Sequence, residues 1–260
     1  MKRQFLGITT PSASGHLWRI RYWGLGMLWG VVCGICVSCL SAESAWITGD
    51  AQGTVVGTPA VPVTRMDGVL AQTPVKAGTL SIEMTFVGGG DLRALAVDQG
   101  GGKLQGLGLG ASAIQSATGT VDYGAGEWTI HFAPTGLVGE FTVTASYRAG
   151  LDASDPTNEI LREEFASDSD PLLFLGDALR APETTPGSLC IKLRRRADSR
   201  VIGILRDTGS GELDGATFLN GELPGYIAGR IRYRNGAWTV RVPSPGLIED
   251  IVVEAEYASN

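Results

Sequence analysis

The chain has 260 residues, of which 37 are glycine and only 18% are charged, against about 25% in an average globular protein. This composition favours many short strands joined by tight turns and argues against a bundle of charged, amphipathic helices. The formal net charge is −6, and it falls to −10 without the four basic residues of the first 42 positions. An acidic surface repels phosphate backbones, so we expect no nucleic-acid partner.

The first 42 residues have the order of a secretory signal peptide. A basic flank with Lys2, Arg3, Arg19 and Arg21 precedes an uncharged run over residues 23–40. Small residues lie near the end of this run, at Ser38, Ser41 and Ala42. The run of 18 residues is also close to the ~20 that span a bilayer. The segment is therefore predicted to be either a cleaved signal peptide or a retained anchor. Its basic flank places the folded part outside the cytoplasm, secreted or at the cell surface.

Three of the four cysteines, Cys33, Cys36 and Cys39, lie within the apolar run. An iron–sulfur cluster usually needs four thiolates, whereas cysteine in an apolar segment behaves as a small hydrophobe. We therefore predict no cofactor there. If the segment is removed, Cys190 is the only thiol left, so no disulfide can form within the chain and stability must come from the core.

Residues 43–65 form a leading segment of extended character, with apolar residues such as Trp46 and Val55 separated by glycines and prolines. Two arrangements are open for this segment. It can lie as an extra edge strand on its own module, or it can pair with a neighbouring copy by strand addition. The second arrangement would produce a chain of subunits.

The rest of the sequence contains an internal repeat. Residues 78–106 match residues 187–215 at a constant offset of 109, and both copies contain DxGxGxLxG, at 98–106 and 207–215. After one inserted residue, 119–130 match 229–240 and 141–147 match 251–257 at an offset of 110. A register kept over about 70 residues indicates a duplication.

Apolar residues alternate with polar ones inside the matched blocks. Residues 121–132 place Val121, Tyr123, Trp128, Ile130 and Phe132 on one face, and the second copy repeats the pattern at 231–242. Period two predicts strands with one buried face, and Gly124–Gly126 or Asn235–Gly236 joins two of them in a hairpin.

Each copy should contain five or six short strands that bury their apolar faces against each other. The predicted fold class is all-β, with two tandem small antiparallel β-sandwich modules. Module 1 covers residues 66–148 and module 2 covers residues 175–260.

Residues 149–174 separate the two modules and are rich in carboxylates. Asn158 can cap a short helix that ends near Phe165, because asparagine satisfies free amides at a helix start. We therefore predict an acidic, partly helical linker. The alternative is a calcium site formed by its carboxylates.

The glycine loops after Asp98 and Asp207 are the other candidates for calcium. Each loop has one aspartate, whereas calcium takes six to eight oxygens, so a turn in which aspartate bonds its own backbone accounts for the same residues. Gly106–Gly110 overlaps a dinucleotide-binding pattern, but β-periodicity resumes at Gly119 where a helix would be needed. We expect neither a metal nor a cofactor.

No catalytic residues are predicted. His131 is the one histidine beyond the amino-terminal segment, and alternation places it on the solvent face opposite Ile130 and Phe132. The chain has no nucleophile elbow, zinc-binding HExxH helix or phosphate-binding loop. A hydrolase with two distant carboxylates stays open, because such pairs have no local motif.

The order GTxxIxx, DxGxGxLxG, GTVDYGAGEWTIHF and VTASY resembles a small β-module of phage tail, baseplate and virion structural proteins and of some exported bacterial structural proteins. The resemblance covers Leu70–Tyr147 and, with weaker identity, Leu179–Tyr257. It implies a structural or assembly role and no catalytic residues. Because phage components are made in the cytoplasm, the export-like amino terminus favours the bacterial class.

We therefore expect a non-enzymatic structural protein of the cell surface or of an extracellular assembly. Its partners would be copies of itself or other structural proteins, with membrane contact only through an uncleaved amino terminus. The alternatives are a phage-like structural protein and a secreted module that binds carbohydrate or protein through loops 107–118 and 217–228. The sequence leaves the oligomeric state and the physiological partner open.

Overall fold

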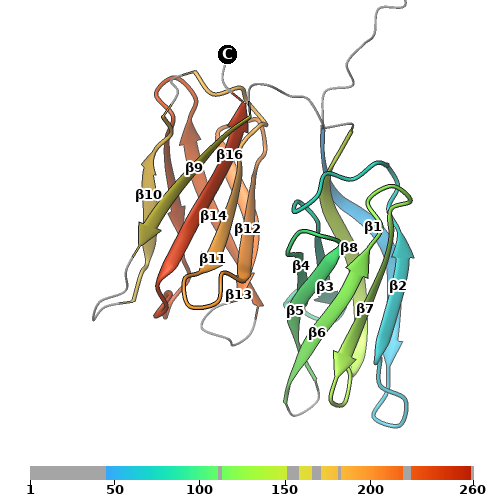
Figure 1. Ribbon diagram of the computed structural model, residues 1–260. Coiled ribbons are helices and arrows are strands. Elements are labelled where there is room, and N and C mark those ends of the chain that lie inside the picture. Colours follow the sequence, from blue (N-terminus) through green and yellow to red (C-terminus); the bar gives the residue numbers. More distant parts are fainter. Residues whose placement is uncertain are drawn as a thin grey trace, which may run out of the picture. The chain divides into compact units, whose positions relative to one another are not determined.

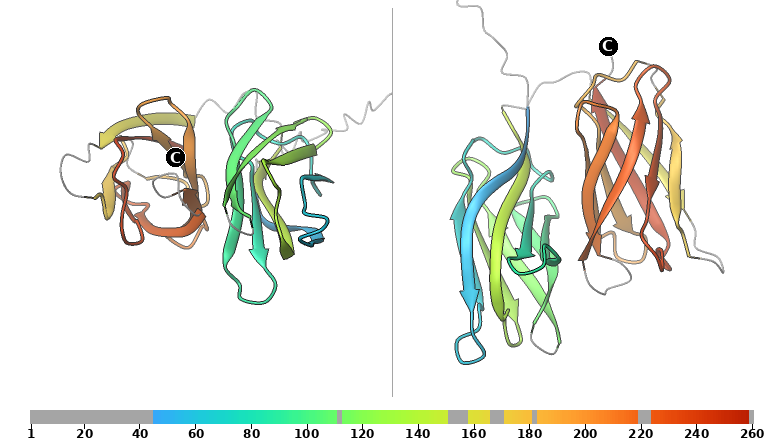
Figure 2. Two further views of the ribbon diagram at one scale, coloured as in Figure 1. Left: turned by 90° about the horizontal axis from the view of Figure 1, so that it is seen from below. Right: turned by 180° about the vertical axis from the view of Figure 1, so that it is seen from behind.

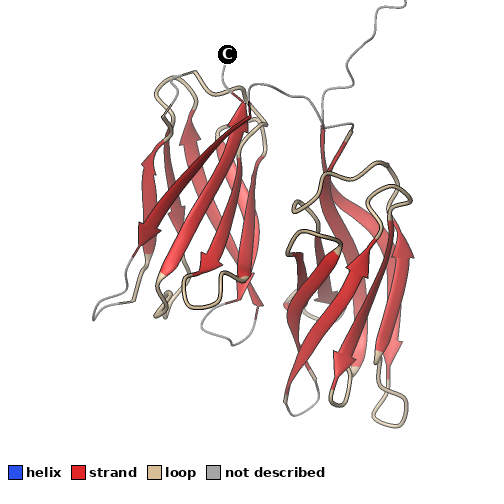
Figure 3. Ribbon diagram, viewed as in Figure 1, coloured by secondary structure: helices blue, strands red, loops and turns tan. Residues whose placement is uncertain are grey.

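The computed structural model describes residues 45–110, 113–150, 158–165, 171–180, 183–218 and 224–258. These residues form sixteen β-strands and no helix (Figure 3), which confirms the all-β class. Within these ranges no helix is long and apolar enough to cross a membrane. The predicted signal peptide or anchor at residues 1–42 lies outside the described residues.

The first sheet contains eight antiparallel strands in the spatial order β1-β8-β3-β4-β5-β6-β7-β2 (Figure 1). Their bounds are β1 Ala45–Gly57, β2 Arg65–Val69, β3 Ser81–Phe86, β4 Leu92–Asp98, β5 Lys103–Leu109, β6 Ile114–Val121, β7 Glu127–Ala133 and β8 Gly139–Ala149. The leading segment therefore supplies the edge strand β1, which pairs with β8 of the same chain. This is the first of the two arrangements left open for the segment.

The second sheet also has eight antiparallel strands, in the order β10-β15-β14-β13-β12-β11-β16-β9. Their bounds are β9 Asn158–Phe165, β10 Phe174–Ala178, β11 Cys190–Arg195, β12 Val201–Asp207, β13 Glu212–Phe218, β14 Pro224–Arg232, β15 Ala237–Arg241 and β16 Ile251–Ala258. Each strand has a counterpart at the same place in the first sheet, with β9 corresponding to β1 and β10 to β2.

The helix predicted at Asn158–Phe165 is wrong, because these residues form strand β9. They pair with β16 along their whole length, from Asn158 opposite Ala258 to Phe165 opposite Ile251. A capping residue is a weak local preference, whereas pairing along eight residues of β16 satisfies backbone groups on the otherwise open edge of that strand. The stretch predicted as a linker thus supplies a strand of the second sheet.

The predicted count of five or six strands per copy is also too low. The repeat blocks missed the two edge strands of each sheet, which are β1 and β2 in the first sheet and β9 and β10 in the second. β1 has irregular register between Ile47 and Asp50 and between Ala51 and Gly53. Such irregularities shift the inward face along the strand, so the alternation that identified the other strands is lost.

Alternate side chains of each sheet point into a core. On β7, Trp128, Ile130 and Phe132 are buried, while Glu127 and His131 are exposed, as predicted. Each sheet curls round on itself (Figure 2), which makes the fold sandwich-like or barrel-like. On β15 of the second sheet, Trp238 and Val240 are likewise buried.

The last glycine of each DxGxGxLxG motif lies in a strand and not in a turn. A Cβ atom on Gly106 of β5 would lie 1.8 Å from the carbonyl oxygen of Leu95 on β4. On Gly215 of β13 it would lie 2.0 Å from the carbonyl oxygen of Ile204. These glycines are therefore shared by both copies because the neighbouring backbone leaves no space for a side chain.

Candidate functional site

The aspartate loops predicted from the repeat are hydrogen-bonded turns. Asp98, at the end of β4, accepts hydrogen bonds from the Gly78 amide (2.6 Å), the Gly100 amide (2.8 Å) and the Tyr123 hydroxyl (2.8 Å). The Tyr123 hydroxyl oxygen in turn accepts the Gly102 amide at 2.9 Å. One carboxylate and one phenol thereby hold two separate turns of the first sheet together.

The second copy repeats this arrangement atom for atom. Asp207 accepts the Gly187 amide at 2.6 Å, the Gly209 amide at 2.9 Å and the Tyr233 hydroxyl at 2.6 Å. The Gly211 amide donates to the Tyr233 hydroxyl oxygen at 2.8 Å. We call the two arrangements the Asp98–Tyr123 latch and the Asp207–Tyr233 latch.

The latches are partly withdrawn from water, which sets their protonation. Burial raises the pKa of the Asp98 carboxyl, although hydrogen bonds from Gly100, Tyr123 and Gly78 act in the opposite direction. Burial also raises the pKa of Tyr123 and of Tyr233 to about 12. Both phenols therefore stay protonated near neutral pH and act as hydrogen-bond donors.

In both latches, the carboxylate oxygens already accept hydrogen bonds from groups of the protein. Asp98 and Asp207 are only 1% and 2% exposed. Among the described residues there is no group of three or more His, Cys, Asp and Glu side chains placed to hold a metal ion. Of the acidic stretch considered for calcium, residues 151–157 and 166–170 lie outside the described residues.

The other predicted candidates lie apart from one another. His131 is exposed on the outward face of β7, as predicted. Cys190 is buried at the start of β11, and burial raises the pKa of its thiol. The prediction of loops at 107–118 and 217–228 is largely wrong, because most of these residues belong to strands β5, β6, β13 and β14. Residues 111–112 and 219–223 lie outside the described residues.

A cluster of arginines that the sequence analysis did not single out surrounds the turn between β11 and β12. Residues 194–200 read RRRADSR, whereas the equivalent residues 85–91 of the first copy read TFVGGGD. Comparing the two copies for their differences could have found this cluster, because the repeat was identified from their similarities. We call residues 194–200 the arginine turn.

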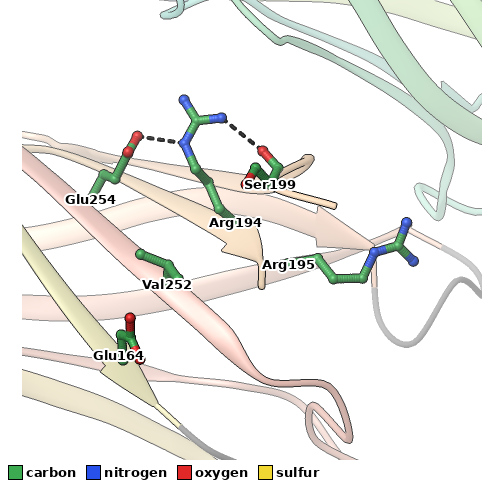
Figure 4. Close-up of a pocket in the computed structure, with 6 residues that line it drawn as sticks. All are labelled: Glu164, Arg194, Arg195, Ser199, Val252 and Glu254. Carbon is green, nitrogen blue, oxygen red and sulfur yellow. Dashed lines mark hydrogen bonds and ion pairs between the residues drawn. The ribbon is translucent and has the colours of Figure 1, made fainter. Parts of the chain in front are cut away.

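Carboxylates from β16, from the loop before β16 and from the turn itself accept hydrogen bonds from the arginine turn. The Arg194 Nε atom donates to Glu254 on β16 at 2.5 Å, and its Nη1 atom donates to the Ser199 carbonyl oxygen at 3.0 Å (Figure 4). Arg195 donates two hydrogen bonds to the Asp198 carboxylate, of 2.9 and 2.5 Å, and its Nη1 atom lies 3.4 Å from Glu249.

The third arginine of the turn is held less firmly. Arg196 lies 3.3 Å from Glu164 on β9, and both side chains are more than half exposed. Such exposed pairs contribute little to stability. Three consecutive arginines therefore face carboxylates from three different segments of the second sheet.

The hydrogen bonds from Arg195 lower the pKa of Asp198 to about 2. In turn, the carboxylates of Asp198 and Glu249 raise the pKa of Arg195. Both groups therefore stay charged across the physiological range. A group that stays charged in this way is poorly suited to take up and release a proton during a reaction.

A hollow of about 390 Å³ lies beside the turn, lined by Arg194, Arg195 and Ser199 together with Glu164, Val252 and Glu254 (Figure 4). Its lining includes both positively and negatively charged side chains, and the hollow is large enough for a small polar ligand. Chemically, the site offers donors and acceptors for hydrogen bonding to such a ligand.

No known protein-family model matches the chain, and no curated protein matches it.

Proposed function

We propose that the chain is a non-enzymatic structural protein of the cell surface or of an extracellular assembly. In this proposal, each eight-stranded sheet is one of two tandem β-sandwich modules, and the basic, apolar amino terminus directs export. The partners are further copies of the chain or other structural proteins.

One observation carries the proposal. The two copies keep in common the groups that build the fold: the Asp98–Tyr123 and Asp207–Tyr233 latches, the strand glycines and the core tryptophans. The buried carboxylates of the latches are bonded to backbone amides of turns, which is a structural use of a titratable group. The residues that the two copies share thus build the fold, which supports a structural role.

Self-association through strand addition is part of the proposal, and β1 is the strand to test. It is an edge strand, and it pairs with β8 from Ala45 opposite Ala149 to Gly57 opposite Gly139. The same pairing between two copies would link them through an exchanged β1. Deleting residues 43–65 would remove the strand itself, so a covalent lock is a sharper test than a deletion.

Thr54 on β1 lies directly opposite Thr142 on β8, and both side chains are exposed. Directly opposed residues of antiparallel strands have the Cα separation that a disulfide requires. We therefore propose the variant Thr54→Cys/Thr142→Cys, with Cys33, Cys36 and Cys39 changed to serine, oxidised after purification. The matched control is Thr54→Cys alone in the same serine background.

Strand exchange predicts a ladder of disulfide-linked chains on a non-reducing gel, which disappears with reductant and in the control. A single band at the monomer position, together with unchanged assembly by light scattering, would exclude exchange of β1. Negative-stain microscopy of the exported protein tests the wider proposal. Polymers or particles are expected, and isolated single chains would contradict a role in an assembly.

A second candidate function is a secreted binding module, and the hollow beside the arginine turn favours it. The pairing of Arg194 with Glu254 beside an open space of about 390 Å³ is a polar arrangement suited to a hydroxylated or charged small ligand. Screening a glycan and peptide array with the wild type and with Arg194→Ala/Arg195→Ala tests this function. A hit that both proteins bind equally would not come from this site.

The resemblance of the repeat to phage tail, baseplate and virion modules supports a phage-like structural role as a further alternative. The export-like amino terminus ranks it below the cell-surface role.

A further inference from the structure

We propose that copies of this chain associate head to tail, with a basic face of the second sheet docking on an acidic face of the first sheet of the next copy. This inference rests on the self-association included in the proposed function, and it names the surfaces involved. Both faces include the turn and the second strand of equivalent hairpins, β6–β7 and β14–β15, and they carry opposite net charge.

The basic face consists of Arg230 and Arg232 on β14, Arg241 on β15 and Arg234 in the turn between them, and we call it the arginine face. All four side chains are exposed. Within the part of the chain that the structure describes, none of the four makes an ion pair. One carboxylate of the same sheet lies beside these arginines: Glu212 on β13 is directly opposite Arg230, without an ion pair, and the four arginines outnumber it.

The strand register places these arginines on one side of the sheet. Arg230 lies opposite Thr239, and Arg241 lies opposite Ala228, the residue two positions before Arg230. Residues two apart on a strand share a face and are about 7 Å apart. On the edge strand β10, the exposed residue opposite Arg241 is Phe174, so β10 adds no carboxylate next to it.

The acidic face consists of Asp67 on β2, Glu127 on β7 and Asp122 in the turn before β7, and we call it the carboxylate face. All three are exposed. The register places Asp67 opposite Thr129 and Glu127 opposite Val69, so both lie on the outward side. The cation paired with this face is Arg65, 3.4 Å from Asp67, in an ion pair whose two side chains are 60% and 68% exposed.

Comparing equivalent positions reveals the reversal of charge. Asp122 of the first copy corresponds to Arg232 of the second, and Thr120 to Arg230. On the next strand inward the reversal runs the other way, with Lys103 on β5 corresponding to Glu212 on β13. A face with net positive charge and a face with net negative charge attract each other, whereas two identical faces would repel.

Contact between two different faces of one chain is a heterologous contact, and it extends into a ring or a filament instead of stopping at a dimer. The chain as a whole is acidic, with a net charge of −6, so a patch with an excess of positive charge also attracts a second copy over a distance. Because the paired charges are exposed to solvent, the association is predicted to weaken as salt increases.

The test uses the full chain and reverses charges on each face separately. Arg230→Glu/Arg232→Glu leaves two arginines and two glutamates on the arginine face and so removes its net positive charge, and Asp67→Arg/Glu127→Arg gives the carboxylate face a net positive charge. A third variant carries all four substitutions, so that its net charge equals that of the wild type and the two exchanged pairs are again opposite in charge. Glu140→Lys, an exposed charge change on β8 away from both faces, is the control. Self-association is measured by sedimentation velocity over a range of protein and salt concentrations.

We expect each reversal alone to raise the concentration needed for half association by roughly tenfold or more, because attractive pairs become repulsive ones. A mixture of the two reversed proteins should associate, and the fourfold variant should regain self-association. Glu140→Lys should behave like the wild type. Recovery in the mixture also establishes that both reversed proteins are folded.

Two results would overturn the inference. If the wild type associates but the reversals do not weaken it, or the mixture and the fourfold variant do not recover, the faces are wrong and self-association by another surface stands. If the wild type stays monomeric at every concentration and at low salt, both this inference and the self-association in the proposed function fail.

Discussion

Removing one hydroxyl group from the Asp98–Tyr123 latch should destabilise the first sheet measurably. Tyr123→Phe keeps the aromatic ring and its packing but removes the oxygen atom that donates to Asp98 at 2.8 Å and accepts the Gly102 amide at 2.9 Å. The Asp98 carboxylate, 1% exposed, loses one of its three donors. The substitution therefore isolates the latch from the hydrophobic core.

The expected loss follows from the two bonds. A hydrogen bond to a charged group contributes about 1.5–3 kcal/mol, and a neutral one about 0.5–1.5 kcal/mol. Tyr123 is only half-buried, so water can partly replace the hydroxyl group at the Gly102 amide. We expect the free energy of unfolding to fall by about 2–3 kcal/mol.

Urea denaturation followed by circular dichroism measures this loss, and hydrogen exchange read by mass spectrometry locates it. Peptides that contain residues 99–105 should exchange faster in Tyr123→Phe, while those that contain residues 208–214 should keep their protection. Tyr233→Phe is the matched variant in the second copy and should give the opposite pattern. The double variant Asp98→Asn/Tyr123→Phe should cost less than the sum of its single variants, because the two groups share one bond.

The interpretation of the latch would be refuted by a specific pair of results. These are an unfolding free energy of Tyr123→Phe within about 0.5 kcal/mol of the wild type, the range expected for a neutral surface change, and unchanged exchange of residues 99–105. In that case the phenol would be packed beside Asp98 without holding the turn.

Three further predictions concern the packing and the charges. Trp128→Ala should cost about 3–5 kcal/mol and expose peptides from residues 45–149 to hydrogen exchange while sparing those from 158–258; equal loss in both would contradict independent modules. Gly106→Ala should destabilise by more than about 2 kcal/mol in urea, because its Cβ would meet the Leu95 carbonyl, whereas Gly124→Ala, whose nearest contact is 3.4 Å away, should be neutral. Because hydrogen bonds from Arg195 lower the pKa of Asp198 to about 2, this exposed group stabilises the fold above pH ~4 and loses that contribution, under ~1 kcal/mol, as the pH falls towards 2; the urea midpoint of Asp198→Asn should lack this part of the pH dependence.

The inner strands of each copy could be predicted from sequence because their alternation is regular. Trp128, Ile130 and Phe132 are buried at every second position, and the turn before them has Gly126 at positive φ. These are local properties: the side-chain period of a strand and the backbone freedom of glycine. They fixed the all-β class and the hairpins without reference to the rest of the chain.

The edge strands could not be predicted in the same way. Asn158–Phe165 contains a capping residue and several carboxylates, and by itself it favours a short helix. It becomes a strand because the edge of β16 offers it unpaired backbone groups. That partner lies about 90 residues later in the sequence, so no local pattern reports it.

The same distinction between local pattern and long-range contact applies to the candidate sites. The sequence identified Asp98 and Asp207 as turn residues, but Tyr123 as the partner that closes the latch depends on two hairpins meeting in space. Similarly, the basic run 194–196 is visible in the sequence, whereas its pairing with Glu254, Asp198 and Glu164 is not.

The sequence by itself determined the internal repeat of residues, the β-class and the turns, because side-chain alternation, glycine conformation and a register of 109 and then 110 residues are properties of the chain in order. Only the tertiary structure decided which strands lie at the sheet edges, which charges are matched within a sheet and which face outward unpaired. Those features depend on distances between residues far apart in the chain, which one sequence does not encode in any local pattern.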